Sequence, residues 1–305
     1  MENDPIKTKY KLKEDPIFKY KHLDPLPSEK DLKLFYQKKY FQELKKRKGT
    51  KESKLINKKN RARSKELEWL KKTYFEDRLD VFNKYFPFNK KLILDIGCGS
   101  GEFLEFMKNS GWKVVGIEPS EEAFNQAKKK GITVYNLPLE EFVSQSNKKK
   151  EKFDVIVFDN ILEHVLKPKE ILMISHKLLS PDGISYIKVP NDFNRLQLLA
   201  QKKLNKRKWW IAIPDHINYF NFQSLEKLLK FCGFEVLLKT TDFPMELFLL
   251  MGDDYVDNPE IGKMCHQKRV NFEFSISKEL RRNLYNKLAE LGLGRECIIY
   301  ARNKI

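Results

Sequence analysis

The stretch Leu92-Ile93-Leu94-Asp95-Ile96-Gly97-Cys98-Gly99-Ser100-Gly101-Glu102 decides the fold of this chain. An apolar run ends in a carboxylate, three alternating glycines follow, and apolar residues then recur at helical spacing over residues 102–107. Glycines allow positive φ and let a ligand approach the backbone with no Cβ in the way. The pattern therefore predicts a strand, a tight turn and a helix, with a ligand site over the turn.

The acidic residues on either side of this turn indicate which ligand binds there. A second apolar run, residues 113–117, ends at Glu118, where a carboxylate can accept hydrogen bonds from two ribose hydroxyls. Asp95 would repel the pyrophosphate of a dinucleotide but would attract the ammonium and sulfonium groups of S-adenosyl-L-methionine. The spacing of the glycines also differs from the dinucleotide fingerprint. We therefore expect S-adenosyl-L-methionine as the cofactor.

The motif Leu94 to Gly101 resembles the first motif of class I S-adenosylmethionine-dependent methyltransferases. Leu162-Glu163-His164-Val165 resembles the small-molecule branch of that family. The segments 214–220 and 233–236 resemble methyltransferases of sugar, surface-polysaccharide and secondary-metabolite pathways. The resemblance implies a set of cofactor-binding residues, which are Asp95, Gly97, Cys98, Gly99, Gly101, Glu118, Pro119, Leu139, Asp159 and Asn160.

From residue 90 onward, strand and helix patterns alternate, which is typical of a doubly wound α/β sheet. We expect a Rossmann-like, mostly parallel sheet of seven strands with a helical N-terminal region and cap insertions. The predicted strands are Leu92–Asp95, Lys113–Ile117, Thr133–Tyr135, Asp154–Phe158, Ile184–Val189, Glu235–Lys239 and Cys297–Ala301.

The chain divides at residue 64 into a basic, partly helical N-terminal segment (1–64) and a methyltransferase domain (65–305). In the first segment, a helix is expected after Ser28 and a polar, basic linker over residues 49–64. Apolar residues from Leu67 to Phe86 then predict a helix that packs on the core. Two long connections, 191–221 and 241–296, are expected to form a cap.

Composition narrows the function further. The net charge is +17, but residues 1–75 hold 23 Lys and Arg against 11 Asp and Glu, and Lys outnumbers Arg 48 to 11. Arginine is the preferred reader of phosphates and bases, so nucleic acid is the less favoured partner. No apolar run reaches the roughly 20 residues of a membrane span, which predicts a cytoplasmic protein. The four scattered cysteines predict no metal site.

Two histidines are the candidates for removing the acceptor's proton. His216, between an acid and a run of aromatic residues in the cap, is the first choice, and His164 in the loop after the fourth strand is the second. An unperturbed imidazole has a pKa near 6.5, which suits a general base. The alternative for each is a histidine that holds a loop by hydrogen bonding.

The cap also predicts the acceptor. Its cationic, aromatic and amide side chains suggest contacts with a hydrophilic small molecule, such as a phosphate- or nucleotide-linked sugar, methylated at O or N. The candidate substrate residues are Arg195, Arg207, Trp209, Trp210, Asn218 and Tyr219. Two alternatives stay open, an RNA methyltransferase with a basic N-terminal arm and a non-catalytic cofactor-binding scaffold. The sequence leaves the oligomeric state open.

Overall fold

The computed structural model describes residues 9–28, 30–32, 63–85, 91–146 and 152–304. Its main sheet has seven strands in the order β5-β4-β3-β6-β7-β10-β9. The first five of these are parallel, and β10 runs antiparallel to both β7 and β9. The predicted fold class is confirmed, and each predicted strand lies within an observed strand. These strands are β3 (Leu92–Ile96), β4 (Lys113–Ile117), β5 (Thr133–Tyr135), β6 (Phe153–Asp159), β7 (Leu179–Pro190), β9 (Phe234–Thr240) and β10 (Glu296–Asn303).

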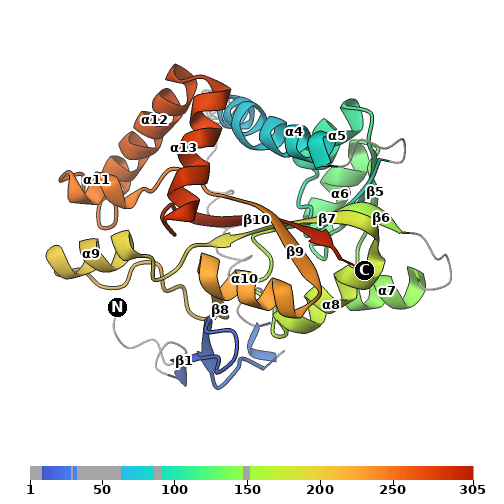
Figure 1. Cartoon of the computed structure of the whole chain (residues 1–305), viewed down its shortest axis with the longest axis horizontal. Helices are drawn as coiled ribbons and strands as arrows, with labels where there is room; N and C mark the ends of the chain where they lie inside the picture. Colours follow the sequence, from blue (N-terminus) through green and yellow to red (C-terminus); the bar gives the residue numbers. More distant parts are fainter. Residues whose placement is uncertain (1–8, 29, 33–62, 86–90, 147–151, 305) are drawn as a thin grey trace, which may run out of the picture.

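Helices cover both faces of this sheet (Figure 1). On one face lie η1 (Lys71–Phe75), α4 (Glu76–Tyr85), α5 (Glu102–Asn109) and α6 (Glu121–Lys129). On the other lie α7 (Leu139–Ser146), α8 (Pro168–Leu178) and α10 (Phe222–Phe231). The predicted helix before the first strand is thus present as a continuous helical stretch over residues 63–85. The expected helix after Ser28 and most of the basic linker lie outside the described residues.

Alternation along the strands fills both layers of the core. In β6, Ile156 and Phe158 pack beneath α7 and α8, whereas Val155 and Val157 pack on the side of α4 and α5. Successive side chains of a strand point to opposite faces, so a strand covered on both sides is apolar throughout. Each such side chain contributes about 1.5–3 kcal/mol through burial. This rigid centre sets the positions of the loops that follow β3, β4, β6 and β7.

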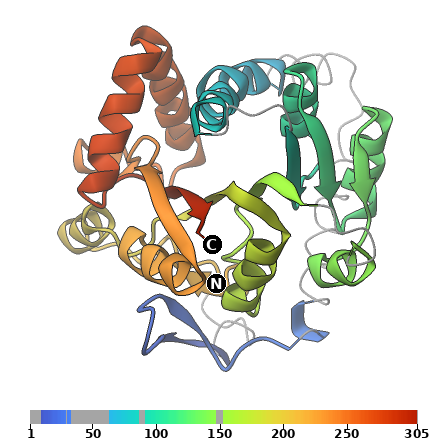
Figure 2. The same ribbon diagram turned by 45° about the vertical axis from the view of Figure 1, so that its right-hand side comes forward.

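A second sheet of three strands joins the N-terminal segment to the cap. It contains β1 (Lys11–Glu14), β2 (Lys21–Asp24) and β8 (Asn218–Tyr219), in that order. The hairpin lies on the side of the main sheet that α8 and α10 cover (Figure 2), and Phe18 contacts Phe231 of α10 with ring centroids 5.1 Å apart. These strands are not predicted from the sequence, because β1 and β2 have only four residues each, and β8 has two residues and pairs with β2 from about 200 residues further along the chain.

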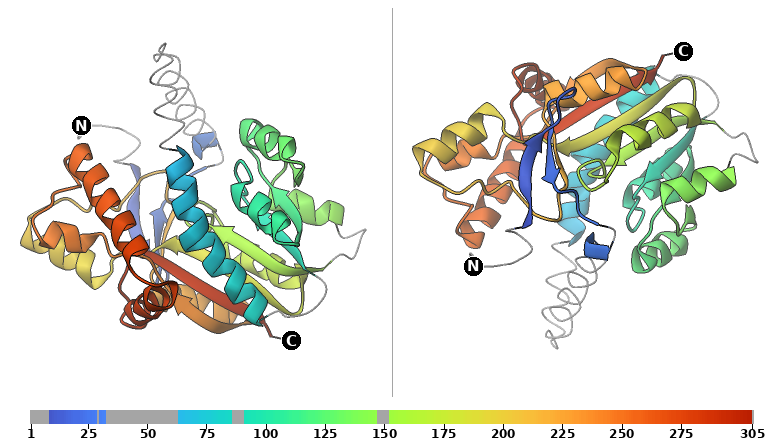
Figure 3. Two further views of the ribbon diagram at one scale, coloured as in Figure 1. Left: turned by 90° about the horizontal axis from the view of Figure 1, so that it is seen from above. Right: turned by 90° about the horizontal axis from the view of Figure 1, so that it is seen from below.

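The two long connections, which the sequence predicts to form a cap, contain helices. These are α9 (Arg195–Lys203), α11 (Glu246–Leu250), α12 (Pro259–Ser275) and α13 (Lys278–Glu290). Helices α9, α11 and α12 gather at one end of the molecule, and β4 and β5 lie at the other (Figure 3). Within the described part of the chain, no helix combines the length and apolarity that crossing a membrane requires.

Candidate functional site

The glycine turn after β3 forms the floor of the predicted cofactor site. Gly97, Gly99 and Gly101 all have positive φ, at 75°, 55° and 78°. A Cβ on Gly97 would lie 2.3 Å from the side chain of Ile161, and one on Gly101 would lie 2.6 Å from that of Ile132. A side chain at either position would therefore strain the backbone and displace a neighbouring isoleucine, and α5 begins directly after the turn. The backbone N–H groups of residues 97 and 98 donate to the carbonyl oxygen of Ile117, which ties the turn to β4.

Glu118, directly after β4, contacts the same turn. One carboxylate oxygen accepts a hydrogen bond of 2.8 Å from the N–H of Gly99, and the other accepts one of 2.7 Å from the N–H of Ser120. The two bonds fix the orientation of the carboxylate, and each oxygen keeps a second lone pair. This geometry suits a group that accepts hydrogen bonds from two neighbouring hydroxyls.

Asp95 is buried at the end of β3, one strand away. Burial, together with the nearby carboxylates of Asp159 and Glu118, raises the pKa of Asp95 to about 8. A buried carboxylate whose pKa is raised in this way gains most from a cationic ligand. The ammonium and sulfonium groups of S-adenosylmethionine would provide that charge.

Asp159, at the end of β6, has its own counter-ions. Arg78 of α4 lies 2.5 Å from one carboxylate oxygen, and Lys188 of β7 lies 3.1 Å from the other. Burial raises the pKa of Asp159, but the two cations outweigh burial and lower this pKa below its usual range. The guanidinium of Arg78 also lies over the rings of Tyr186 and Phe103, 4.2 Å and 4.9 Å from their centroids.

Arg78 and Lys188 are not among the site residues predicted from the sequence. A signal for the first is present, because Leu70, Tyr74, Arg78 and Phe82 follow one another at intervals of four on a single helix face. A charged residue on such an apolar stripe indicates a buried partner. Lys188 gives no comparable signal, since lysine is common along this chain.

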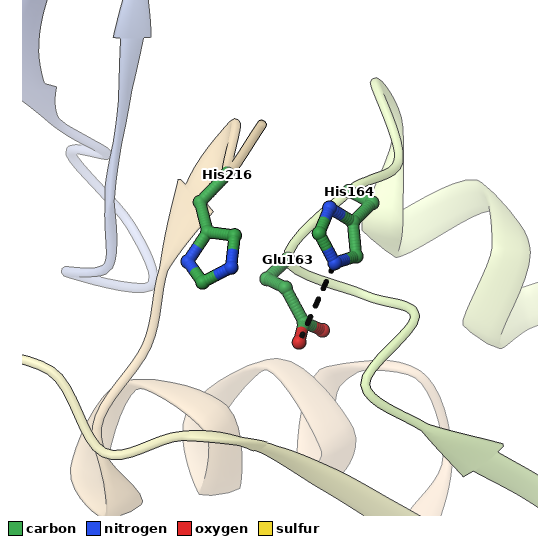
Figure 4. Close-up of side chains that lie close together, drawn as sticks. All are labelled: Glu163, His164 and His216. Carbon is green, nitrogen blue, oxygen red and sulfur yellow. Dashed lines mark ion pairs between the residues drawn. The ribbon is translucent and has the colours of Figure 1, made fainter. Parts of the chain in front are cut away.

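The two candidate histidines lie side by side. Their ring centroids are 5.0 Å apart and the rings are nearly perpendicular, with the side chain of Glu163 close to both (Figure 4). Nδ1 of His164 lies 2.7 Å from the carbonyl oxygen of Asp215, so we assign the proton to Nδ1. This leaves the lone pair on Nε2, which lies 3.8 Å from a carboxylate oxygen of Glu163.

Glu163, His164 and His216 are also the group best placed to hold a metal ion among the described residues. Their ligand atoms lie within 4.8 Å of one another. The carbonyl of Asp215 orients His164 as an outer partner orients a metal-bound imidazole. The geometry thus allows two roles for His164, a general base or a metal ligand, although the sequence predicts no metal.

The predicted substrate residues separate into two groups. Arg195 and Arg207 are exposed on the cap, and the neighbouring Lys206 is paired with Asp254 and Asp257 at 2.6 Å and 2.7 Å. Trp209 and Trp210 contact each other, with Trp210 buried against Phe193. Asn218 is buried and donates to the carbonyl oxygens of Leu162 and Val165, and buried Tyr219 belongs to the cluster between the hairpin and the cap.

The remaining predicted cofactor residues border the site in different ways. Leu139 is buried in the core at the start of α7, whereas Pro119 and Asn160 are exposed. Asn160 adopts a left-handed conformation with φ 57° directly after β6. The Cys98 thiol is buried, and burial raises its pKa, so it has no reactive character. The individual contacts of these residues with the cofactor stay predictions.

Comparison with known proteins now identifies the class. A family described as a methyltransferase domain matches residues 67–239, which is more than half of the chain. The chain belongs to this family, and S-adenosylmethionine is its methyl donor. The expected class and cofactor are thereby confirmed.

Curated relatives agree with this assignment. A protein of Actinobacillus pleuropneumoniae serotype 7 named ubiquinone biosynthesis O-methyltransferase is 39% identical over 111 residues, 34% of this chain and 47% of that protein. A protein of Caulobacter vibrioides with the same name is 33% identical over 201 residues, 63% of this chain and 74% of that protein. The chain thus spans about half the length of the first of these relatives.

The solved structure supports the fold. It is the plantazolicin methyltransferase BamL in complex with a triazolic desmethylPZN analog and SAH. It aligns with a TM-score of 0.50 at 18% identity, over 81% of this chain and 90% of that one. At this identity the likeness extends to the fold alone.

Proposed function

We propose that this protein transfers the methyl group of S-adenosylmethionine to a hydroxyl oxygen of a small molecule, with His164 as the general base. The observation that carries this proposal is the orientation of His164. Its Nδ1–H donates to the carbonyl of Asp215, which leaves Nε2 as a proton acceptor in the loop directly after β6. In an open α/β sheet, ligands bind beyond the carboxyl ends of the strands, so this loop borders the methyl donor.

Methyl transfer from S-adenosylmethionine requires two things from the protein, alignment of the acceptor and removal of its proton. The sulfonium is already a good leaving group, so the acceptor oxygen has to be aligned in line with the methyl carbon and to lose its proton as the bond forms. Alignment can contribute about 7–11 kcal/mol, and a positioned base about 10² to 10⁴ in rate. His216, the first choice from the sequence, packs edge-on against His164 and is proposed to hold its ring in place.

The names of the relatives support oxygen as the methylated atom and a small molecule as the acceptor. The cap gives less support to the phosphate-bearing sugar that the sequence suggested. Lys206 is already paired with two carboxylates, and the Arg207 side chain is 75% exposed and 4.0 Å from Asp257. None of the relatives reported above is named for action on nucleic acid.

The test is identification of the methylated product. The full chain is incubated with methyl-labelled S-adenosylmethionine and a fractionated cell extract, and the labelled product is purified and analysed. We expect a methyl ether on a small molecule, and a large loss of product with His164→Ala but not with His266→Ala, a control on the surface of α12. Label on nitrogen or carbon, or label recovered in RNA, would contradict the proposal. Absence of any labelled product would instead support a non-catalytic scaffold.

A further inference from the structure

Three buried carboxylates with few close basic partners lie near the proposed base. Glu163, Asp192 and Glu296 are 1%, 1% and 9% exposed. One oxygen of Glu163, both oxygens of Asp192 and one oxygen of Glu296 are buried with no hydrogen-bond partner in the described part of the chain. Buried polar atoms are nearly always paired in folded proteins, so four orphaned carboxylate oxygens in one region indicate a missing ligand.

The three carboxylates follow neighbouring strand ends. Glu163 lies in the loop after β6, Asp192 follows β7, and Glu296 begins β10, where it pairs with Pro190 at the end of β7. One loop contacts two of them, because the N–H groups of residues 217 and 218 donate to the carbonyl oxygen of Glu163, and the N–H of Asp192 donates to that of Phe220. That loop also carries His216. Adjacent strands are about 5 Å apart, so the three acids extend about 5–10 Å along the sheet from β6.

The nearby cations do not balance these charges. Lys188 is paired with Asp159 at 3.1 Å. Arg295 approaches Glu296 only to 3.9 Å, and its side chain is 54% exposed. Burial raises the pKa values of Glu163 and Asp192, and it raises that of Glu296 to about 7. The region thus holds more buried acid than its own cations can neutralise, which is costly unless a ligand brings positive charge.

We propose that Glu163, Asp192 and Glu296 bind a protonated amine on the methyl acceptor and thereby hold the acceptor's hydroxyl beside His164. This inference rests on the proposed function and adds the chemical class of the substrate, a hydroxylated small molecule that carries an amine. An ammonium group has three donors and can bond to carboxylates that come from different strands.

A metal ion fits these three acids less well. The described group whose ligand atoms converge within 4.8 Å contains Glu163, but neither Asp192 nor Glu296. Asp192 and Glu296 are therefore not part of the described group that could coordinate a metal ion.

Binding of two matched sugars tests the proposal on the full chain saturated with S-adenosylhomocysteine. D-glucosamine and D-glucose differ at one position, an ammonium in place of a hydroxyl. By titration calorimetry at pH 7, we expect glucosamine to bind at least tenfold more tightly than glucose. The double variant Asp192→Asn/Glu296→Gln should lose this preference and keep its affinity for S-adenosylhomocysteine. Glu235→Gln, on the exposed side of β9, should leave the affinity for both sugars unchanged.

Equal binding of the two sugars, failure of both to bind, or an unchanged preference in the double variant would overturn the proposal. Magnesium chloride that binds without sugar and abolishes glucosamine binding would also overturn it, in favour of a metal site. These outcomes are separable from those of the proposed function. A labelled methyl ether that contains no amine would disprove only the amine site, whereas glucosamine binding without any methyl transfer would disprove only the function.

Discussion

The carboxylates of the predicted cofactor site and those of the proposed acceptor site differ in their partners. In the cofactor half, Glu118 accepts two backbone hydrogen bonds and Asp159 is held between Arg78 and Lys188. In the acceptor half, the carboxylate of Asp192 accepts no hydrogen bond from the described residues. Glu118 and Asp159 therefore have partners before the cofactor arrives. In our proposals, Asp95 gains its counter-ion from the cofactor and Asp192 gains its counter-ion from the acceptor.

This difference suggests that groups which bind the cofactor can also stabilise the fold, whereas groups which bind the acceptor reduce its stability. A fixed cofactor can be recognised by groups that the fold itself holds in place, because partners on β4, α4 and β7 are always present. An acceptor pocket has to leave polar groups free for the substrate, and these free groups cost folding free energy. The predictions below test that contrast, beginning with the largest expected effect.

The largest effect should come from removing the proposed base. We expect His164→Ala to lower kcat by about 10² to 10⁴ while the affinity for S-adenosylmethionine, measured by calorimetry, changes little. His216→Ala should cost less, because in our proposal it acts only through the ring of His164. Loss of turnover with His216→Ala and near-normal turnover with His164→Ala would return the role of base to His216.

A chelator separates the two roles of His164. As a base it needs no metal, so we expect the rate of the full-length enzyme to be unchanged after treatment with EDTA. A rate that vanishes and returns with added Mg²⁺ or Zn²⁺ would instead show that Glu163, His164 and His216 form a metal site.

The next effect concerns stability and compares the two halves directly. Arg78→Met should lower the free energy of unfolding by about 3 kcal/mol, because it removes one partner of a buried ion pair. Asp192→Asn replaces a buried carboxyl group whose oxygens have no partner among the described residues and whose pKa burial raises, so it should leave stability unchanged or increase it. Both values come from urea denaturation at pH 7. Equal destabilisation by both variants would show that the two halves do not differ in the way proposed.

A smaller effect is expected at the ribose contact. Glu118→Gln should weaken S-adenosylmethionine binding about tenfold or more, since a hydrogen bond to a charged group contributes about 1.5–3 kcal/mol. Glu121→Gln, three residues further on and exposed at the start of α6, serves as the control. Wild-type affinity in a folded Glu118→Gln protein would remove Glu118 from the ribose site.

The same contrast explains how much the sequence could reveal. The seven main strands, the glycine turn, Asp95 and Glu118 could be predicted because their signals are local: apolar runs, positive-φ glycines and acids at strand ends. The hairpin of β1 and β2 could not, since its third strand is two residues long and lies in the cap. The acceptor half combines residues from 163 to 296, which only the packing of the cap brings together. The choice of His164 over His216 as the proposed base also depended on one contact, between Nδ1 of His164 and the carbonyl oxygen of Asp215. The spacing of residues in the sequence does not predict this contact.

The smallest predicted effect is a proton that leaves when the cofactor binds. Because the pKa of Asp95 in the free protein is about 8, most of this group is protonated at pH 7. The ammonium and sulfonium of the cofactor favour the ionised carboxylate, so binding should lower that pKa and release close to one proton. Calorimetry in buffers with different ionisation enthalpies measures this number. The released proton should diminish toward pH 9, where Asp95 is already ionised.

Asp95→Asn is the matched variant for this measurement. It should release no proton and bind S-adenosylmethionine more weakly, because the amide offers no negative charge to the cations of the ligand. The substitution should have the opposite effect on the folding stability of the free protein. A carboxyl whose pKa is raised on folding stabilises the folded state less as the pH rises through its unfolded and folded pKa values, from about 4 to about 8. The free Asp95→Asn protein should therefore be more stable than the wild type at pH 8 and above, with a melting temperature higher by about 2–4 °C per kcal/mol. A less stable variant at that pH would show that Asp95 holds the glycine turn together rather than waiting for a cation.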